Sequence, residues 1–399
     1  MGCLAACDWV DSGLLVDIET RSPMRPRYWH YWASLFLGAA LVPVLRWVHL
    51  PLKFDWITLG VAYWVVLAAQ SIFAAAILAA IGLPREQGWG PFISRYRERP
   101  LRVLLVLVYF AILVWATGGM KALVLTVDTV ALLELRERRS ATELRRDAAA
   151  ILAPAAYLFF GFLMVLAYNS AIVSVRFNFS YDPALAAIDR VLLLGYSVSD
   201  TAHWAVATFP IVFFRALELI YFAMFPQIGA AIVLVALCDR RKRALQFVGT
   251  ILLSYYFALL LFYVWPSQGP YSLCLKHFRR FPDSLQAYNI QRTLITHALA
   301  RWNHEPLARI STDYYIGLPC MHIAQPLVVM WFLQRWKRMV IALAAYDVLL
   351  MMAVVLLEWH YVADIIVGVF VAGLAIAITD GRLRPDRTPV AAVATGAAE

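Results

Sequence analysis

The sequence predicts an all-α, polytopic integral membrane protein, and three observations support this fold class. Hydrophobic residues make up 62% of the 399-residue chain, while charged residues make up only 15%, against about 25% in an ordinary soluble domain. Apolar runs of about 20 residues, long enough to cross a bilayer, recur along most of the chain. The fourteen Trp and nineteen Tyr residues suit a protein with two long membrane–water interfaces.

The apolar runs form an N-terminal and a C-terminal group of predicted helices. The N-terminal runs lie near 31–49, 57–82 and 103–134. The last of these is split by Gly118-Gly119 and has basic flanks at both ends, which favours a hairpin of two short helices. The C-terminal runs lie near 148–174, 216–237, 245–264, 317–334, 340–357 and 361–378.

These runs predict the organisation of the chain. We expect a cytoplasmic N-terminal segment over 1–30, a transmembrane extension over 31–147, a six-helix core over 148–380 and a disordered tail over 381–399. The tail is rich in Ala, Pro and Thr.

The net charge of +9 reflects membrane orientation rather than nucleic-acid binding. Its basic residues fall in short clusters between the apolar runs, as the positive-inside rule requires. The clusters at 239–243, 335–338 and 382–384 are then cytoplasmic. The loop 265–316 and the segment 358–361 are therefore expected on the extracytoplasmic side.

Residues 181–196 predict an amphipathic helix that lies on the extracytoplasmic surface. Leu185, Ile188 and Leu192 recur at helical spacing, and Asp182 and Asp189 fall off that face.

Ionisable residues at the entrances of two apolar runs are the candidates for chemistry. His360 and Asp364 begin the last run, and such a pair is costly where a chain enters the bilayer. Residues four apart share a helix face, so the Asp364 carboxylate can accept the imidazole Nδ1–H and leave Nε2 free to attack. His322 begins an earlier run on the same side. We therefore expect the three residues to meet.

The segment that carries His322 also suits an anion. Gly317 and Pro319 bend the chain there, and the free N–H groups of a helix N-terminus bind phosphate. With two histidines at one phosphate, one can attack and the other can protonate a departing oxygen.

These two motifs resemble the type 2 phosphatidic acid phosphatase superfamily. Its Pro-Ser-x-His motif is similar to the segment 319–322, and its His-x-x-x-Asp motif matches 360–364. The form His-Tyr-x-x-Asp is closest to the branch of inositol phosphorylceramide synthases. Further likeness lies in the segment from Tyr181-Asp182 through Asp189-Arg190, in Phe225-Pro226-Gln227 and in the Pro-rich segment 265–271.

The resemblance implies a role for each motif residue. His360 would be the nucleophile that forms a phosphohistidine, Asp364 would orient and stabilise it, and His322 would protonate the leaving oxygen. No metal and no other cofactor is implied, and no third ligand stands at metal-binding spacing near His360. The substrate would be a phospholipid or other lipid phosphate, diphosphate or phosphodiester, with a lipid alcohol as an optional acceptor.

The chain departs from the family at two positions. Cys320 stands where the family usually has Ser, either as a filler of the phosphate loop or as a catalytic thiol. Val354 stands where many members have Arg, so other cations must meet the phosphate. The residues expected at the substrate are Pro319, Cys320, Met321, Gly269, Tyr271, Arg176, Lys276, Arg279 and Arg280.

A second class of function stays open at this point. His360 and Asp364 also suit a proton relay in a transporter or a hydrogen-bonded pair that holds two helices together. The core runs contain few ionisable residues, and Asp347 is the main exception.

Overall fold

The computed structural model describes residues 141–176, 180–273, 285–292 and 316–380, with a few isolated positions before them. Within this part of the chain the regular structure is helical and contains no strand. The N-terminal extension with its predicted hairpin and the tail after residue 380 lie outside the described residues.

The predicted C-terminal apolar runs are helical. The described elements are α7 (Ala141–Arg176), α8 (Asp182–Leu192), α9 (Val198–Thr208), α10 (Ile211–Phe222), α11 (Met224–Val264), the 3₁₀ turn η2 (Pro270–Ser272), α13 (Met321–Phe332), α14 (Lys337–Leu356) and α15 (Val362–Thr379). The six-helix core is not confirmed, because the run near 216–237 begins in α10 and continues with the run near 245–264 as the single 41-residue helix α11. The described chain holds five segments long and apolar enough to cross a membrane: Arg145–Val173, Ile211–Cys238, Arg241–Val264, Lys337–Leu356 and Val362–Thr379. The protein is therefore a multi-pass membrane protein.

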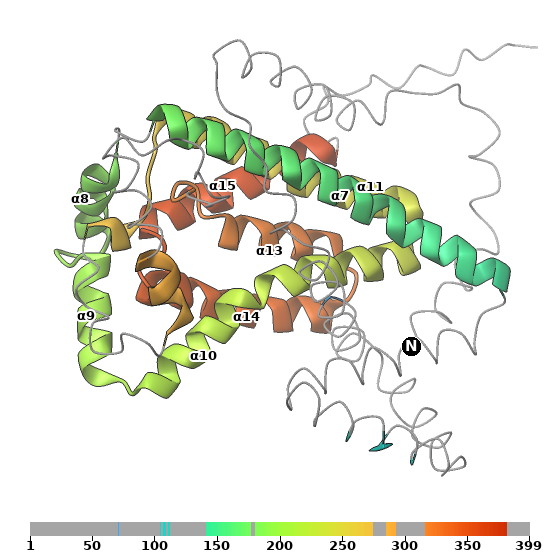
Figure 1. Ribbon diagram of the computed structural model, residues 1–399, viewed down its shortest axis with the longest axis horizontal. Coiled ribbons are helices and arrows are strands. Elements are labelled where there is room, and N and C mark those ends of the chain that lie inside the picture. Colours follow the sequence, from blue (N-terminus) through green and yellow to red (C-terminus); the bar gives the residue numbers. More distant parts are fainter. Residues whose placement is uncertain are drawn as a thin grey trace, which may run out of the picture.

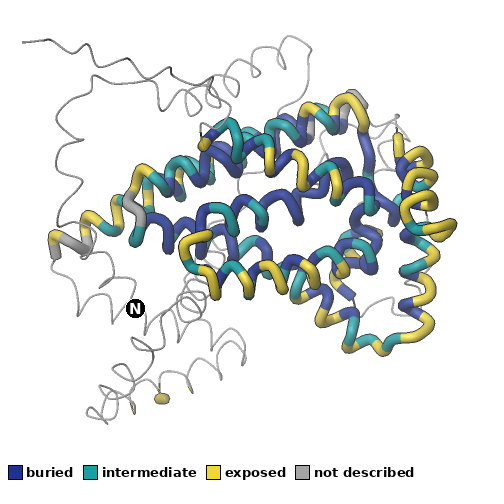
Figure 2. The backbone as a smooth tube through the Cα atoms, turned by 180° about the vertical axis from the view of Figure 1, so that it is seen from behind, coloured by how far each residue is buried: buried dark blue, intermediate teal, exposed yellow. Residues whose placement is uncertain are grey.

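Helix α13 is the short, central member of the bundle (Figure 1). It packs against α11, α14 and α15, while α7 runs along α11 and α10 runs along α14. Nearly every residue of α13 is buried, as expected for a helix that is apolar on all sides. Its 12 residues extend over about 18 Å, well short of the hydrocarbon core of about 30 Å. Figure 2 shows buried residues along the inside of the bundle and exposed ones on its outer faces.

The two ends of the bundle differ in chemistry. At the end where α13 and α15 finish, the Arg243 guanidinium lies 4.3 Å above the Phe332 ring and 3.8 Å from a carboxylate oxygen of Asp380. The side-chain amide of Gln246 donates to the Thr379 carbonyl at 2.9 Å. His322 and His360 stand at the opposite end, where α13 and α15 begin. Arg243 and the basic segment 335–338, which follows the end of α13, thus lie at the end opposite the histidines, and the compartment that each end faces stays a prediction.

Helices α8 and α9 lie across the histidine end of the bundle (Figure 1). The helix predicted over 181–196 is present as α8, and its two aspartates point away from the apolar residues Ile188 and Leu192. Asp182 and Asp189 are fully buried, whereas Ile188 and Leu192 are 48% and 43% exposed. The carboxylates turn inward because they accept N–H groups from two other segments. Helix α9, which the sequence did not predict, begins at a capping box formed by Ser197 and Asp200.

Candidate active site

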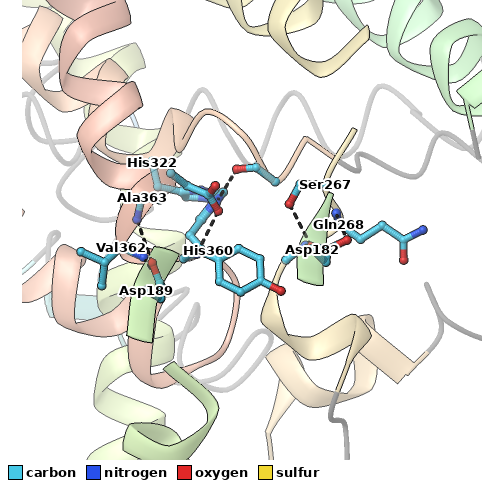
Figure 3. Close-up of polar contacts among 12 residues, drawn as sticks. Asp182, Asp189, Ser267, Gln268, His322, His360, Val362 and Ala363 are labelled. Atoms are coloured by element: carbon cyan, nitrogen blue, oxygen red, sulfur yellow. Dashed lines mark hydrogen bonds and ion pairs between the residues drawn. The ribbon is translucent and has the colours of Figure 1, made fainter. Parts of the chain in front are cut away.

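The imidazoles of His322 and His360 lie side by side in the bundle, as the sequence predicts (Figure 3). His322 Nδ1 is 3.1 Å from His360 Nε2, a hydrogen-bonding distance. Both side chains are buried, with 8% and 3% exposure. His322 is the second residue of α13, and His360 belongs to the short connection between α14 and α15. Two residues 38 positions apart therefore share one small site.

A backbone carbonyl, and not Asp364, accepts the hydrogen bond of His360. His360 Nδ1 is 2.8 Å from the Gly317 carbonyl oxygen, so this nitrogen carries a proton and donates it. The Asp364 carboxylate is 3.6 Å from Nδ1, beyond hydrogen-bonding distance. The i to i+4 geometry expected from sequence does not apply, because α15 begins only at Val362. Nε2 still faces the site, as predicted.

Asp364 has a structural contact of its own. One carboxylate oxygen accepts from the Tyr361 backbone N–H at 2.9 Å and so caps the start of α15. Its other oxygen is buried without a hydrogen-bond partner in the described part of the chain. The carboxylate thus remains close enough to His360 to act on it through charge.

The end of α14 aims the His360 backbone into the site. The N–H of Trp359 donates to the Val354 carbonyl at 2.9 Å, and that of Glu358 donates to the Val355 carbonyl at 3.0 Å. These two bonds form a Schellman motif, and its left-handed position is held by Glu358 with φ +57°. A non-glycine residue costs about 1–2 kcal/mol there. The chain reverses tightly before His360 despite this cost.

Helices α13 and α15 approach each other at the backbone. The Cys320 N–H donates to the Asp364 carbonyl at 2.9 Å. A Cβ on Gly368 would clash with the Cys320 carbonyl oxygen, so this close approach requires a glycine. Because the Cys320 N–H is already bonded, the N–H groups of Met321 and His322 in the first turn of α13 are those left for an anion.

Asp189 of α8 holds the start of α15. Its two carboxylate oxygens accept from the backbone N–H groups of Val362 at 3.0 Å and Ala363 at 3.1 Å (Figure 3). Burial raises the pKa of Asp189, and these two N–H donors lower it in part. A negative charge at a helix N-terminus is stabilised by the helix dipole. The anion position of α15 is thus filled by the protein, whereas that of α13 is not.

Asp182, which lies two turns before Asp189 on the same buried face of α8, holds the Pro-rich segment after α11. Its carboxylate accepts from the Ser267 hydroxyl at 2.9 Å and from the backbone N–H groups of Gln268 at 3.1 Å and Gly269 at 2.9 Å (Figure 3). Sequence analysis did not assign either aspartate to the site. A signal was present in the sequence: two carboxylates stand seven residues apart in a short, mostly apolar helix.

The Pro-rich segment supports the connection that carries His360. Gly269 has φ +109°, and a Cβ on it would lie 2.3 Å from the Trp359 carbonyl oxygen. The Tyr271 N–H donates to the Glu358 carbonyl at 3.1 Å, and its ring packs edge-on against Trp359 at 5.6 Å. Gly269 and Tyr271 therefore support the connection before His360, and their expected contact with the substrate stays a prediction.

An aromatic stack on the other side of His322 was not expected from sequence. The Tyr221 ring of α10 stacks on His322 at 4.3 Å between centroids and on Trp359 at 5.3 Å. His322 Nε2 is buried and has no hydrogen-bond partner among the described residues. Stacking therefore fixes the plane of this ring, while its one hydrogen bond goes to His360.

The structure describes only some of the other residues that are expected at the substrate. Pro319, Cys320 and Met321 are buried beside the two histidines. Arg176 is the last residue of α7, but its side chain lies outside the described part of the structure. Lys276, Arg279 and Arg280 lie outside it as well. The cation that replaces the arginine missing at Val354 therefore stays a prediction.

Cys320 brings a third ligand-type side chain to the histidine pair. One donor atom each from Cys320, His322 and His360 lies within 4.8 Å of the other two. The expectation that no third metal-ligand residue lies near His360 therefore does not hold. The spacing along the chain hides this group, because two of its members come from the entry of α13 and one from the connection before α15.

The protonation of His360 follows from its neighbours. Burial lowers the pKa of His360, but the neighbouring Cys320 side chain and the Asp364 carboxylate outweigh it and raise the pKa to about 10. At neutral pH the histidine pair therefore holds a proton. Protons shared between coupled groups belong to the pair rather than to either ring.

Asp347 is a buried ionisable residue inside a spanning helix. It lies in α14 with 2% exposure, and both carboxylate oxygens lack a hydrogen-bond partner among the described residues. The side-chain amide of Gln325 in α13 is likewise buried and without a partner there. Unsatisfied polar groups at this depth are costly and commonly functional.

The paired histidines can supply a nucleophile and a proton donor to one phosphate group. In a comparison with protein families, residues 183–378 match the model of the PAP2 superfamily, which agrees with the resemblance of the two motifs. No curated protein and no solved structure matches the chain. The family match indicates a phosphatase-type activity on a lipid phosphate in a membrane protein.

Proposed function

We propose that this protein is a lipid phosphatase or headgroup transferase that works through a phosphohistidine at His360. The observation that carries the proposal is the 3.1 Å contact between His322 Nδ1 and His360 Nε2. A nucleophile and a proton donor must stand within hydrogen-bonding reach of the same reacting group. These two atoms meet that condition, and each belongs to the histidine of one of the two family motifs.

The shared proton gives each ring its role. When the proton moves from His360 Nε2 to His322 Nδ1, it leaves a lone pair on Nε2 and an acid on His322. Nε2 then attacks phosphorus, the bond from phosphorus to the leaving oxygen breaks, and His322 protonates that oxygen. The Gly317 carbonyl holds the Nδ1–H of His360 at 2.8 Å throughout, and so keeps Nε2 aimed at the substrate.

The substrate phosphate must replace the contact between the two rings. At 3.1 Å the nitrogens leave no room for a phosphoryl group between them. The first N–H groups of α13 lie beside this position and can donate hydrogen bonds to the phosphate oxygens. Basic residues of the loop that follows η2, including Lys276, Arg279 and Arg280, would supply the positive charge from the extracytoplasmic side.

The second half of the reaction decides between hydrolysis and transfer. Water at the phosphohistidine releases phosphate, whereas a lipid hydroxyl takes over the headgroup. The form His-Tyr-x-x-Asp favours transfer, as in the branch of inositol phosphorylceramide synthases. Incubation of purified protein with labelled phospholipids and candidate lipid alcohols separates the two, since one yields free phosphate and the other a new lipid.

Substitution of each histidine tests the assignment. His360→Ala should reduce turnover to background, and His322→Ala should reduce it by about 10²–10⁴-fold, the usual contribution of a proton-transfer group. His203→Ala, at an exposed position of α9, serves as the control. Acid-labile, base-stable labelling of the wild type but not of His360→Ala would identify the intermediate. Full turnover by His360→Ala would refute the nucleophile.

The burial of Asp347 favours one alternative to the enzyme, a transport function. A buried carboxylate without a partner in a spanning helix suits a proton carrier, as in a transporter in which His360 and Asp364 relay protons. Proton uptake by reconstituted vesicles that Asp347→Asn abolishes would favour transport. Phosphate release that Asp347→Asn leaves intact would favour the enzyme.

A further inference from the structure

The thiol of Cys320 lies beside the histidine pair. Cys320 is fully buried, and it is the N-cap of α13 without a side-chain cap hydrogen bond. The proposed reaction gives its thiol no role. Together with His322 and His360 it forms the group of donors that lie within 4.8 Å of one another.

The two imidazoles already have an arrangement that a metal ion requires. Bonds of about 2.0–2.3 Å in a tetrahedral zinc site place the donor atoms about 3.3–3.8 Å apart. The contact between His322 Nδ1 and His360 Nε2, at 3.1 Å, is close to that separation. The sulfur needs to shift by only about 1 Å from the outer limit of 4.8 Å to reach the same range.

The neighbours of His360 also fit a ligand role. A histidine that binds a metal almost always donates its other N–H to a carbonyl or carboxylate, which fixes the tautomer. His360 Nδ1 donates to the Gly317 carbonyl at 2.8 Å, and the Asp364 carboxylate lies 3.6 Å away. Nε2 is therefore presented as the ligand atom before any ion arrives.

The chemistry of the three donors selects the ion. One thiolate and two imidazoles suit soft or borderline cations such as Zn²⁺, Cd²⁺ and Co²⁺, and they do not suit Mg²⁺ or Ca²⁺, which prefer oxygen ligands. Three protein ligands leave a fourth position open. We propose that Cys320, His322 and His360 bind one zinc-type divalent cation, which occupies the position of the substrate phosphorus and blocks turnover. The binding stands by itself, and the inhibition rests on the proposed function.

Binding of the ion must release protons. The Cys320 thiol gives up its proton when sulfur bonds to the metal, and the proton shared by the histidines leaves so that both nitrogens can bind. The affinity should therefore increase as the pH rises, because protons and the metal compete for the same atoms.

A cobalt titration of the purified, chelator-treated protein tests the site. We expect one Co²⁺ per chain, with thiolate-to-cobalt charge-transfer absorption and the visible bands of a tetrahedral ion, both lost when Zn²⁺ is added. Cys320→Ser should remove the charge-transfer absorption and weaken binding by at least about 100-fold. Cys238→Ser, which removes a thiol outside this group, should change neither quantity.

Each outcome decides the proposal. Cobalt bound as tightly by Cys320→Ser as by the wild type, or bound without thiolate absorption, would overturn the site. If Cys320→Ser fails to fold, His322→Gln provides the second variant, and it should lose the tetrahedral bands while it keeps an intact thiol.

Activity measurements separate this proposal from the proposed function. Zinc at concentrations that displace cobalt should stop phosphate release, and a chelator should restore it. Cobalt binding in a protein that turns over no lipid phosphate would refute the proposed function and leave the site standing. Turnover that is unaffected by zinc in a protein that binds no cobalt would refute the site and leave the function standing.

Discussion

The burial of Asp182 gives the sharpest test of how the active site is held together. Each of its two carboxylate oxygens accepts two hydrogen bonds. One oxygen accepts from the Ser267 hydroxyl and the Gly269 N–H, and the other oxygen accepts from the Ser180 hydroxyl and the Gln268 N–H. Asp182→Asn keeps one oxygen and turns the other into an N–H donor. One pair of donors therefore loses its acceptor.

The structure sets the expected size of this loss. A donor left without a partner costs about 1–3 kcal/mol, and hydrogen bonds to a charged acceptor are worth about 1.5–3 kcal/mol each. We expect Asp182→Asn to lower the free energy of unfolding by about 2–4 kcal/mol. For a domain of 150–250 residues this lowers the Tm by roughly 5–15 °C.

Thermal unfolding in detergent, together with phosphate release, measures the effect. The matched control is Asp200→Asn, which makes the same change at an exposed capping box in α9 and should cost about 1 kcal/mol. Turnover should fall in Asp182→Asn alone, because the segment that Asp182 holds supports the backbone before His360. An equal Tm for the two variants, with normal turnover in both, would refute the role of Asp182.

Three further changes test neighbouring features of the site. Gly269→Ala should destabilise the protein by about 2 kcal/mol or more and stop turnover, since it adds a Cβ next to the Trp359 carbonyl and strains a positive φ; a normal Tm would contradict this. Cys320→Ser removes one of the groups that raise the pKa of His360, so the alkaline loss of kcat/KM, expected near pH 10 where the pair loses its proton, should begin at lower pH. An unchanged pH profile would show that the thiol does not act on the pair. Asp347→Asn should leave kcat/KM within about 2-fold, and a large loss would place this carboxylate in the reaction path.

The arrangement of residues 31–147, the predicted N-terminal extension, stays a prediction from the sequence. The basic flanks of the 103–134 segment predict a hairpin with both ends on the cytoplasmic side. Tags placed at Arg99 and Arg138 and tested for access from each side of the membrane would check this. Labelling from opposite sides would contradict the hairpin and reverse the expected side of the histidines.

Sequence alone determined the membrane helices and the meeting of His322 with His360. Apolar run length follows from bilayer thickness, and two motifs at the same ends of neighbouring helices must come together. Tertiary structure decided which groups surround them. The Gly317 carbonyl at His360, the Tyr221 ring on His322 and the Cys320 thiol beside both come from segments whose contacts no local spacing encodes. Helix α8 shows the reason most clearly: Asp182 and Asp189 face the protein, because N–H groups of the loop and of α15 require acceptors there.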